Sequence, residues 1–121
     1  MNDKENSLRN KSFRFALNVV NIYKKLISEK REFIMSKQLL RSGTSVGANL
    51  REAQNAQSKA GFVHKFAIAQ KECDETLYWF ELMFQSEYLN KQEFDALYID
   101  ATELLKMIRS SIITTKRNHN L

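Results

Sequence analysis

The sequence predicts a single all-α domain, and three observations lead to this prediction. The 121 residues contain no proline and only three glycines, against averages of about 5% and 7%, so residues for the tight turns of an all-β fold are scarce. Hydrophobic residues make up 43% and charged residues 27%, the balance of a globular domain. Four segments repeat apolar residues at spacings of three and four. We therefore expect an antiparallel up-down four-helix bundle spanning residues 1–121.

The first helix is expected over about residues 10–29. Its predicted core stripe consists of Phe13, Ala16, Leu17, Val20, Tyr23 and Ile27. The opposite face carries Lys11, Arg14, Asn18, Asn21 and Lys25. Residues 1–9 are mostly polar and are expected to form a frayed tail.

The other three helices are marked by apolar lines and by capping residues. The second is expected from about Ser36 to about residue 57, with a core line of Leu39, Gly43, Val46, Leu50 and Ala53. Ser58 is positioned to cap a third helix over residues 59–86. Asn90 and Glu93 match a capping box, which opens a fourth helix whose stripe ends near Ile112. Residues 114–121 are expected to be frayed.

The third helix is apolar around more of its circumference than one core stripe requires. Tyr78, Trp79 and Phe80 are consecutive, and Leu82, Met83 and Phe84 follow. At 100° per residue they cover far more than the roughly 100° of a core-facing stripe. We therefore expect Tyr78 and Trp79 to contribute to contact with a second copy of the chain. The alternative is a half-exposed aromatic residue whose polar edge stays in water.

The sequence Gly43-Thr44-Ser45-Val46-Gly47 matches G-x-S-x-G, the nucleophile elbow of α/β-hydrolases. That elbow needs a strand before the serine and a histidine base beside it. Both flanks of this segment read as helix, so we expect no hydrolase activity and no enzyme. Small residues here favour close helix packing, and a local break between two shorter helices is the alternative.

A separate face of the second helix is polar without being uniformly charged. It includes Arg41, Ser45, Asn49 and Glu52, which lie within an arc of about 80° at 100° per residue. We interpret this stripe as a hydrogen-bond network or a contact between subunits. The alternative is an ordinary solvated face, although such faces are usually richer in Lys and Glu.

The positive charge is concentrated near the N-terminus. The net charge is +5, and residues 1–31 carry eight basic and three acidic side chains. Lys11, Arg14, Lys24 and Lys25 are the candidate nucleic-acid-binding residues, because a basic helix face attracts phosphates by releasing counterions. The alternative is a solvated face that pairs with acidic residues of the same or another subunit.

The sequence predicts no cofactor, metal ion or small-molecule substrate. His64 and His119 lack the Glu-x-x-His spacing of di-iron bundles, and with Cys73 they form no short zinc motif. No phosphate-binding glycine loop is present. The N-terminal residues do not resemble a leader and no long apolar run occurs, so we expect a cytoplasmic protein without membrane contact.

Residues 38–53 resemble the four-helix-bundle family encoded in intervening sequences of bacterial 23S ribosomal RNA genes. Further matches are Ser58, Lys59, Phe62, Lys65, Ile68, Ala69, Lys71, Glu72 and the run 75–79. The resemblance extends over about residues 11–113. Arg41, Ser45, Asn49 and Glu52 are its most specific part, because small and polar residues recur there at helical spacing.

This resemblance implies a homo-oligomeric ring, typically a pentamer, with no established enzymatic activity. Relatives include the accessory proteins of diversity-generating retroelements, which are pentamers with a basic surface ascribed to nucleic-acid and reverse-transcriptase binding. We therefore expect a non-enzymatic oligomer that binds RNA or DNA through the basic face of its first helix. The alternative is a protein-interaction scaffold that binds no nucleic acid.

Overall fold

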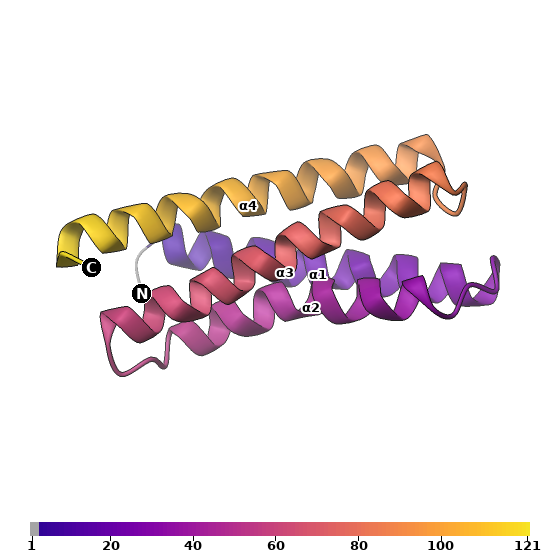
Figure 1. Cartoon of the computed structure of the whole chain (residues 1–121). Helices are drawn as coiled ribbons and strands as arrows, with labels where there is room; N and C mark the ends of the chain where they lie inside the picture. The colour runs from indigo at the N-terminus through magenta and orange to yellow at the C-terminus, as the bar shows by residue number, and fades with distance from the viewer. Residues whose placement is uncertain (1–2) are drawn as a thin grey trace.

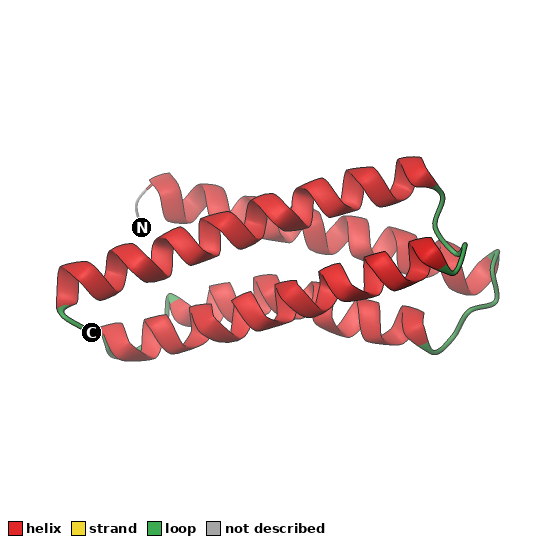
Figure 2. Cartoon of the chain, turned by 45° about the horizontal axis from the view of Figure 1, so that its top comes forward, coloured by secondary structure: helices red, strands yellow, loops and turns green. Residues whose placement is uncertain are grey.

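A computed structural model describes residues 3–121 of the chain. They form four helices: α1 (Asp3–Ser28), α2 (Met35–Ala53), α3 (Lys59–Gln85) and α4 (Lys91–His119). Helices and loops account for the whole of this described part (Figure 2). The all-α class predicted from the periodicity is confirmed for these residues.

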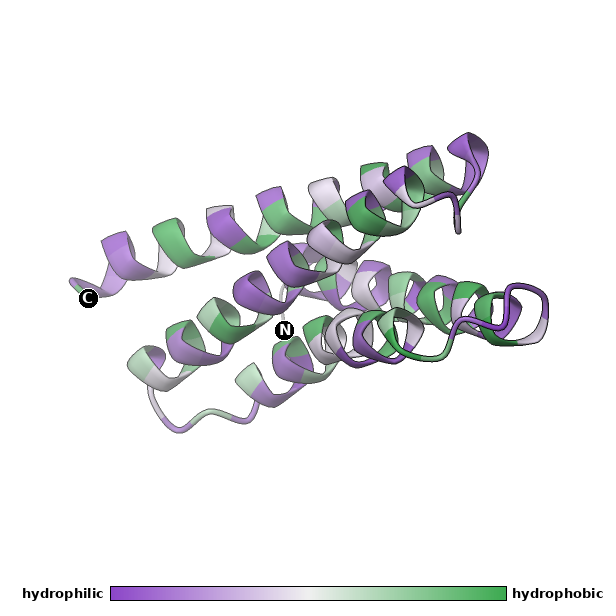
Figure 3. Cartoon of the chain, turned by 45° about the vertical axis from the view of Figure 1, so that its right-hand side comes forward, coloured by the Kyte–Doolittle hydropathy of each residue, from purple (hydrophilic) through white to green (hydrophobic). Residues whose placement is uncertain are grey.

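The helices lie side by side, with connecting loops at alternate ends of the molecule (Figure 1). Within residues 3–121, α1 packs against α2 and α4, and α3 packs against α2 and α4. Hydrophobic and hydrophilic segments alternate along each helix (Figure 3), as expected where one side of a helix faces a shared core. The contact between α1 and α4 joins the two helices that are farthest apart in the sequence.

Two helices are longer than predicted and one is shorter. The described chain is helical from Asp3 onward, and Leu8 is buried, so residues 3–9 are not a frayed tail; residues 1 and 2 lie outside the described residues. α4 continues to His119 rather than fraying after residue 113. α2 ends at Ala53, four residues before the predicted end, because residues 54–58 form the loop to α3.

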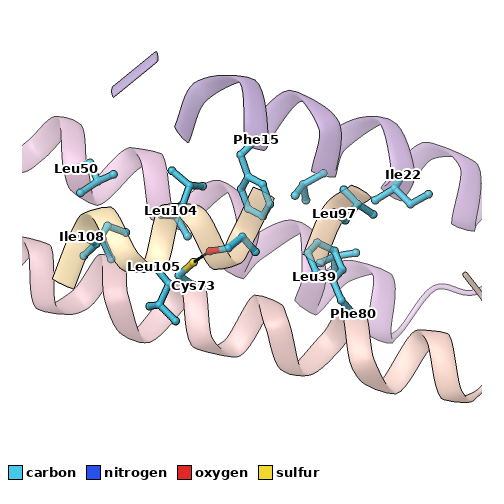
Figure 4. Close-up of a cluster of buried hydrophobic side chains, with 14 of the residues drawn as sticks. Phe15, Ile22, Leu39, Leu50, Cys73, Phe80, Leu97, Leu104, Leu105 and Ile108 are labelled. Carbon is cyan, nitrogen blue, oxygen red and sulfur yellow. Dashed lines mark hydrogen bonds between the residues drawn. The ribbon is translucent and has the colours of Figure 1, made fainter. Parts of the chain in front are cut away.

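The core is built from one buried line on each helix. Phe15 of α1 meets Phe80 of α3 edge to face, with ring centroids 6.2 Å apart. Cys73 lies among these side chains and donates from Sγ to the carbonyl oxygen of Ala101 at 3.3 Å (Figure 4). Burial raises the pKa of the Cys73 thiol to about 12, so the thiol stays protonated and unreactive at neutral pH.

The predicted core stripe of α1 is wrong. The buried line consists of Leu8, Ser12, Phe15, Val19, Ile22 and Leu26. Phe13 and Leu17 are instead 53% and 49% exposed, and Ala16, Val20, Tyr23 and Ile27 are half-buried. α1 carries two apolar lines, and Val19 is on the buried one because it packs directly over Gly43 of α2. The second line is left at the surface.

Both helix starts predicted from capping residues are confirmed. The Ser58 hydroxyl accepts a hydrogen bond from the Gly61 amide at 3.0 Å. Asn90 and Glu93 form the reciprocal capping box, with hydrogen bonds of 2.8 and 2.9 Å. These caps place the starts of α3 and α4 and so set which side chains face α2 and α1.

Candidate functional site

The polar stripe of α2 lies along the seam between α2 and α3. The Arg41 guanidinium donates to Glu72 at 2.9 Å and also to Glu75. The Trp79 indole donates to the same Glu75 carboxylate at 3.4 Å. Desolvation lowers the pKa of Arg41, but the two carboxylates outweigh it and raise that pKa. Arg41 therefore links α2 to α3 through two ion pairs.

The other members of the stripe also find partners within the chain. Ser45 donates from Oγ to the Arg41 carbonyl at 2.6 Å, and Asn49 donates from Nδ2 to the Ser45 carbonyl at 2.8 Å. Glu52 pairs with Lys65 of α3 at 3.0 Å. The structure therefore brings Arg41 and Glu52 to α3, whereas Ser45 and Asn49 bind the backbone of their own helix.

The G-x-S-x-G segment lies within the continuous helix α2. Ser45 has helical neighbours on both sides and its hydroxyl is engaged by the backbone. A nucleophile elbow instead holds its serine on a sharp turn from strand to helix. Gly43 of this segment serves close packing, since a Cβ atom there would lie 2.8 Å from Val19 of α1. The alternative of a local break is wrong, because α2 is continuous.

Most of the apolar residues on the wide arc of α3 pack against other residues of the same chain. Phe84 stacks on Phe94 of α4 with ring centroids 4.5 Å apart, and Trp79 packs against the core. Tyr78 and Leu82 remain 55% and 37% exposed. Of the two predicted contact residues, therefore, Tyr78 is at the surface and Trp79 is largely internal.

Two of the four predicted basic residues are neutralised by α4. Lys11 pairs with Glu103 at 2.6 Å and Lys25 pairs with Glu93 at 2.5 Å. The hydrogen bond from Lys11 lowers the pKa of Glu103, and the hydrogen bond to Glu93 raises the pKa of Lys25. These shifts favour the charged forms of Glu103 and Lys25. A phosphate would have to compete with a carboxylate for each lysine.

Arg14 and Lys24 are exposed, and neither forms an ion pair within residues 3–121. Asn18 and Asn21 are also exposed, and their amides make no side-chain hydrogen bond in this part of the chain. Arg14, Asn18 and Asn21 line a surface hollow of about 360 Å³, whose lining also includes Asp100 of α4. The outer surface of α1 thus presents hydrogen-bond donors that lack protein partners.

A second hollow, which sequence reasoning missed, lies between α1 and α2. Its volume is about 550 Å³, and its lining includes Phe13, Gly47, Arg9, Arg51 and Asn55. The Arg51 guanidinium carbon lies 5.9 Å from the centre of the Phe13 ring. The small residues of α2 were the available sequence signal, but the prediction that Phe13 is a core residue concealed the site.

Comparison with known proteins places the chain in a family. The family model described as 23S rRNA-intervening sequence protein matches residues 4–110. A solved structure of a protein of unknown function from the S23 ribosomal protein family of Bacteroides thetaiotaomicron VPI-5482 has a TM-score of 0.89 and 50% identity, covering 90% of this chain and 97% of that one. No curated protein matches. Within residues 3–121 no helix has the length and apolar character to cross a membrane. The chain belongs to the family of 23S rRNA-intervening sequence proteins.

Proposed function

We propose that this protein is a non-enzymatic, homo-oligomeric helical bundle that binds RNA or DNA through the sugar-phosphate backbone. The outer face of α1 is the binding surface. The observation that carries the proposal is the set of unpartnered donors on that face: the guanidinium of Arg14, the amides of Asn18 and Asn21, and the ammonium of Lys24.

The arrangement of these donors suits phosphates. At 100° per residue, Arg14, Asn18 and Asn21 lie within an arc of about 60°, and Lys24 lies about 60° beyond Asn21. Arginine, lysine and asparagine are regular donors to phosphate oxygens. Arg14 and Lys24 are about 15 Å apart along the helix, which corresponds to about four nucleotides at 3.4 Å per residue of a strand. One strand can therefore contact several donors at once.

The overall charge of α1 supports the same surface. The helix carries six basic and two acidic side chains, so the field outside it is positive. Lys11 and Lys25 contribute to this field, although Glu103 and Glu93 reduce their share. We therefore expect Arg14 and Lys24 to contribute more to affinity than Lys11 and Lys25.

Reversing both unpaired charges, in an Arg14→Glu/Lys24→Glu variant, is expected to weaken RNA binding about tenfold or more at low salt. Fluorescence anisotropy with a labelled 12-nucleotide RNA, repeated at several salt concentrations, measures this change. Loss of two phosphate contacts should also reduce the slope of log affinity against log salt by about 1.4 for a single strand.

The matched control is Lys71→Glu/Lys116→Glu, which makes the same change in net charge on α3 and α4. Both of these lysines are exposed. Equal losses in the two double variants would show that net charge, and not the α1 face, controls affinity. If the wild-type protein does not bind RNA, the proposal is contradicted and a protein-interaction scaffold is favoured.

The proposed assembly is a homo-oligomeric ring, with five subunits as the family resemblance implies. Tyr78 and Leu82 of α3 support contact between copies, because both are exposed apolar side chains on one helix face. We expect light scattering to give five times the 14.2 kDa of one chain. Tyr78→Glu/Leu82→Glu should reduce the mass to that of a monomer, whereas Ile113→Glu, on exposed α4 surface, should not. A monomeric wild type would contradict this arrangement.

A further inference from the structure

The hollow between α1 and α2 has the features of a ligand site. Its volume of about 550 Å³ falls within the range usual for small-ligand pockets. Its apolar lining consists of Phe13, which is 53% exposed, and the small residues Ala16, Gly47 and Ala48. The glycine is not needed for packing on α1, since a Cβ atom there would meet Ser12 at an ordinary 3.4 Å.

The polar groups of this hollow are suited to an anionic ligand with hydrogen-bonding edges. Arg9 and Arg51 both line it, and neither is held by a carboxylate within residues 3–121. Asn55 also lines it, and its side-chain amide makes no hydrogen bond there, so it can both donate and accept. The one acid on the rim, Glu52, is engaged by Lys65. An uncharged apolar partner would leave the two guanidiniums unmatched.

The hollow also adjoins the phosphate-binding face proposed for α1. Phe13 immediately precedes Arg14 and lies about 100° from it around the helix, and it is within about 20° of Lys24, which lies about 17 Å farther along the axis. A strand that follows Lys24 and Arg14 toward the N-terminal end of α1 would therefore reach the hollow beyond Arg14, where Arg9 also lines it. A base rotated out of that strand would meet the Phe13 ring, over which the Arg51 guanidinium carbon lies at 5.9 Å.

We propose that this hollow receives an unstacked base of a single-stranded nucleic acid. The inference rests on the proposed function, because the α1 face holds the phosphates of the nucleotides that lead to that base. Aromatic rings and arginine guanidinium planes are the groups that stack bases in proteins that bind single strands. The amide of Asn55 faces the edge of the base. A duplex keeps its bases stacked on one another, so it gains only the backbone contacts.

The test compares one 12-nucleotide RNA, single-stranded and annealed to its complement, for binding to the wild type and to Phe13→Ala. We expect the substitution to weaken single-strand binding about fivefold or more and to leave duplex binding unchanged. Phe13 is half exposed, so the variant should fold, and circular dichroism verifies this. Phe33→Ala is the matched control, because Phe33 is 51% exposed and lies 5.3 Å from the Arg31 guanidinium carbon, but far from the hollow in sequence.

Each other outcome is distinct. If Phe13→Ala binds the single strand as tightly as the wild type does, the base site is overturned but the backbone proposal is not. If Arg14→Glu/Lys24→Glu binds RNA as tightly as the wild type does, the backbone proposal is overturned. An equal loss in Phe33→Ala places stacking at the loop instead. A lower particle mass for Phe13→Ala, with single-strand affinity unchanged, shows that a second copy fills the hollow. Adenosine monophosphate that competes as strongly as the strand overturns the assignment to a strand.

Discussion

Replacing Glu32 with alanine is expected to lower the free energy of unfolding by about 2–3 kcal/mol. The Glu32 carboxylate is buried and accepts three backbone hydrogen bonds at the start of α2, from Ile34, Met35 and Ser36 at 3.1, 3.0 and 2.7 Å. The residue at the N-cap position, Ile34, makes no side-chain hydrogen bond to these amides. Alanine would leave these amides without an acceptor at the positive end of the helix dipole.

The stabilisation from Glu32 should depend on pH. Burial raises the pKa of Glu32, but the hydrogen bonds from the amides of Ser36, Met35 and Ile34 outweigh it and lower that pKa below the ordinary 4.5. A carboxyl group with a depressed pKa in the folded state stabilises the fold above its unfolded pKa. This stabilisation is lost as the pH falls through the folded value. The difference in stability between wild type and Glu32→Gln should therefore be constant above about pH 5.5 and shrink in more acidic solution.

Urea unfolding followed by circular dichroism, repeated from pH 7 to pH 3, measures both effects. Glu32→Gln keeps an acceptor oxygen but cannot ionise, so its loss at neutral pH should be smaller than that of Glu32→Ala. Glu29→Ala is the control, because Glu29 is exposed one turn earlier and its carboxylate caps nothing. A difference between wild type and Glu32→Gln that does not change with pH would show that the carboxylate charge is not used.

The parts of the fold that depend on neighbouring residues could be predicted from the sequence. The caps at Ser58 and Asn90 each involve residues three apart, so their pattern was readable without knowledge of tertiary packing. The buried face of α1 could not be predicted in the same way. Its two apolar lines have the same spacing, and the choice between them depends on the contact of Val19 with Gly43.

The candidate site shows the same division between local and distant contacts. The arc that joins Arg41 to Glu52 follows from helical spacing alone, but its pairing with Glu72, Glu75 and Lys65 requires the register of α2 against α3. The basic face of α1 was also visible in the sequence. The neutralisation of Lys25 and Lys11 by α4 was not visible in the sequence. Their partners Glu93 and Glu103 lie 68 and 92 positions away along the chain.

Gly43→Ala is expected to lower the free energy of unfolding by about 1–2 kcal/mol, and Gly47→Ala to raise it by up to about 1 kcal/mol. Alanine is about 1 kcal/mol more favourable than glycine within a helix, so both substitutions gain this amount. At Gly43 the new Cβ would lie 2.8 Å from both Cγ atoms of Val19. Overpacking of a core costs typically 1–3 kcal/mol. Val19 is fully buried and stiff because it branches at Cβ, so we expect the upper part of that range.

Opposite signs for the two glycines would establish why this segment is rich in small residues. Both lie in the middle of α2, so helix propensity and unfolded-chain entropy affect them alike. They differ in the space that α1 leaves, since Gly43 is buried against Val19 and Gly47 is half-buried. Val19→Ala supplies the decisive background, because it removes the two methyl groups at 2.8 Å and leaves only the Cβ atom of residue 19, at 3.2 Å. In that background Gly43→Ala should become neutral or stabilising in thermal and urea unfolding. If Gly43→Ala still destabilises by the same amount without those methyl groups, close approach of α1 to α2 is not the reason for a glycine at position 43.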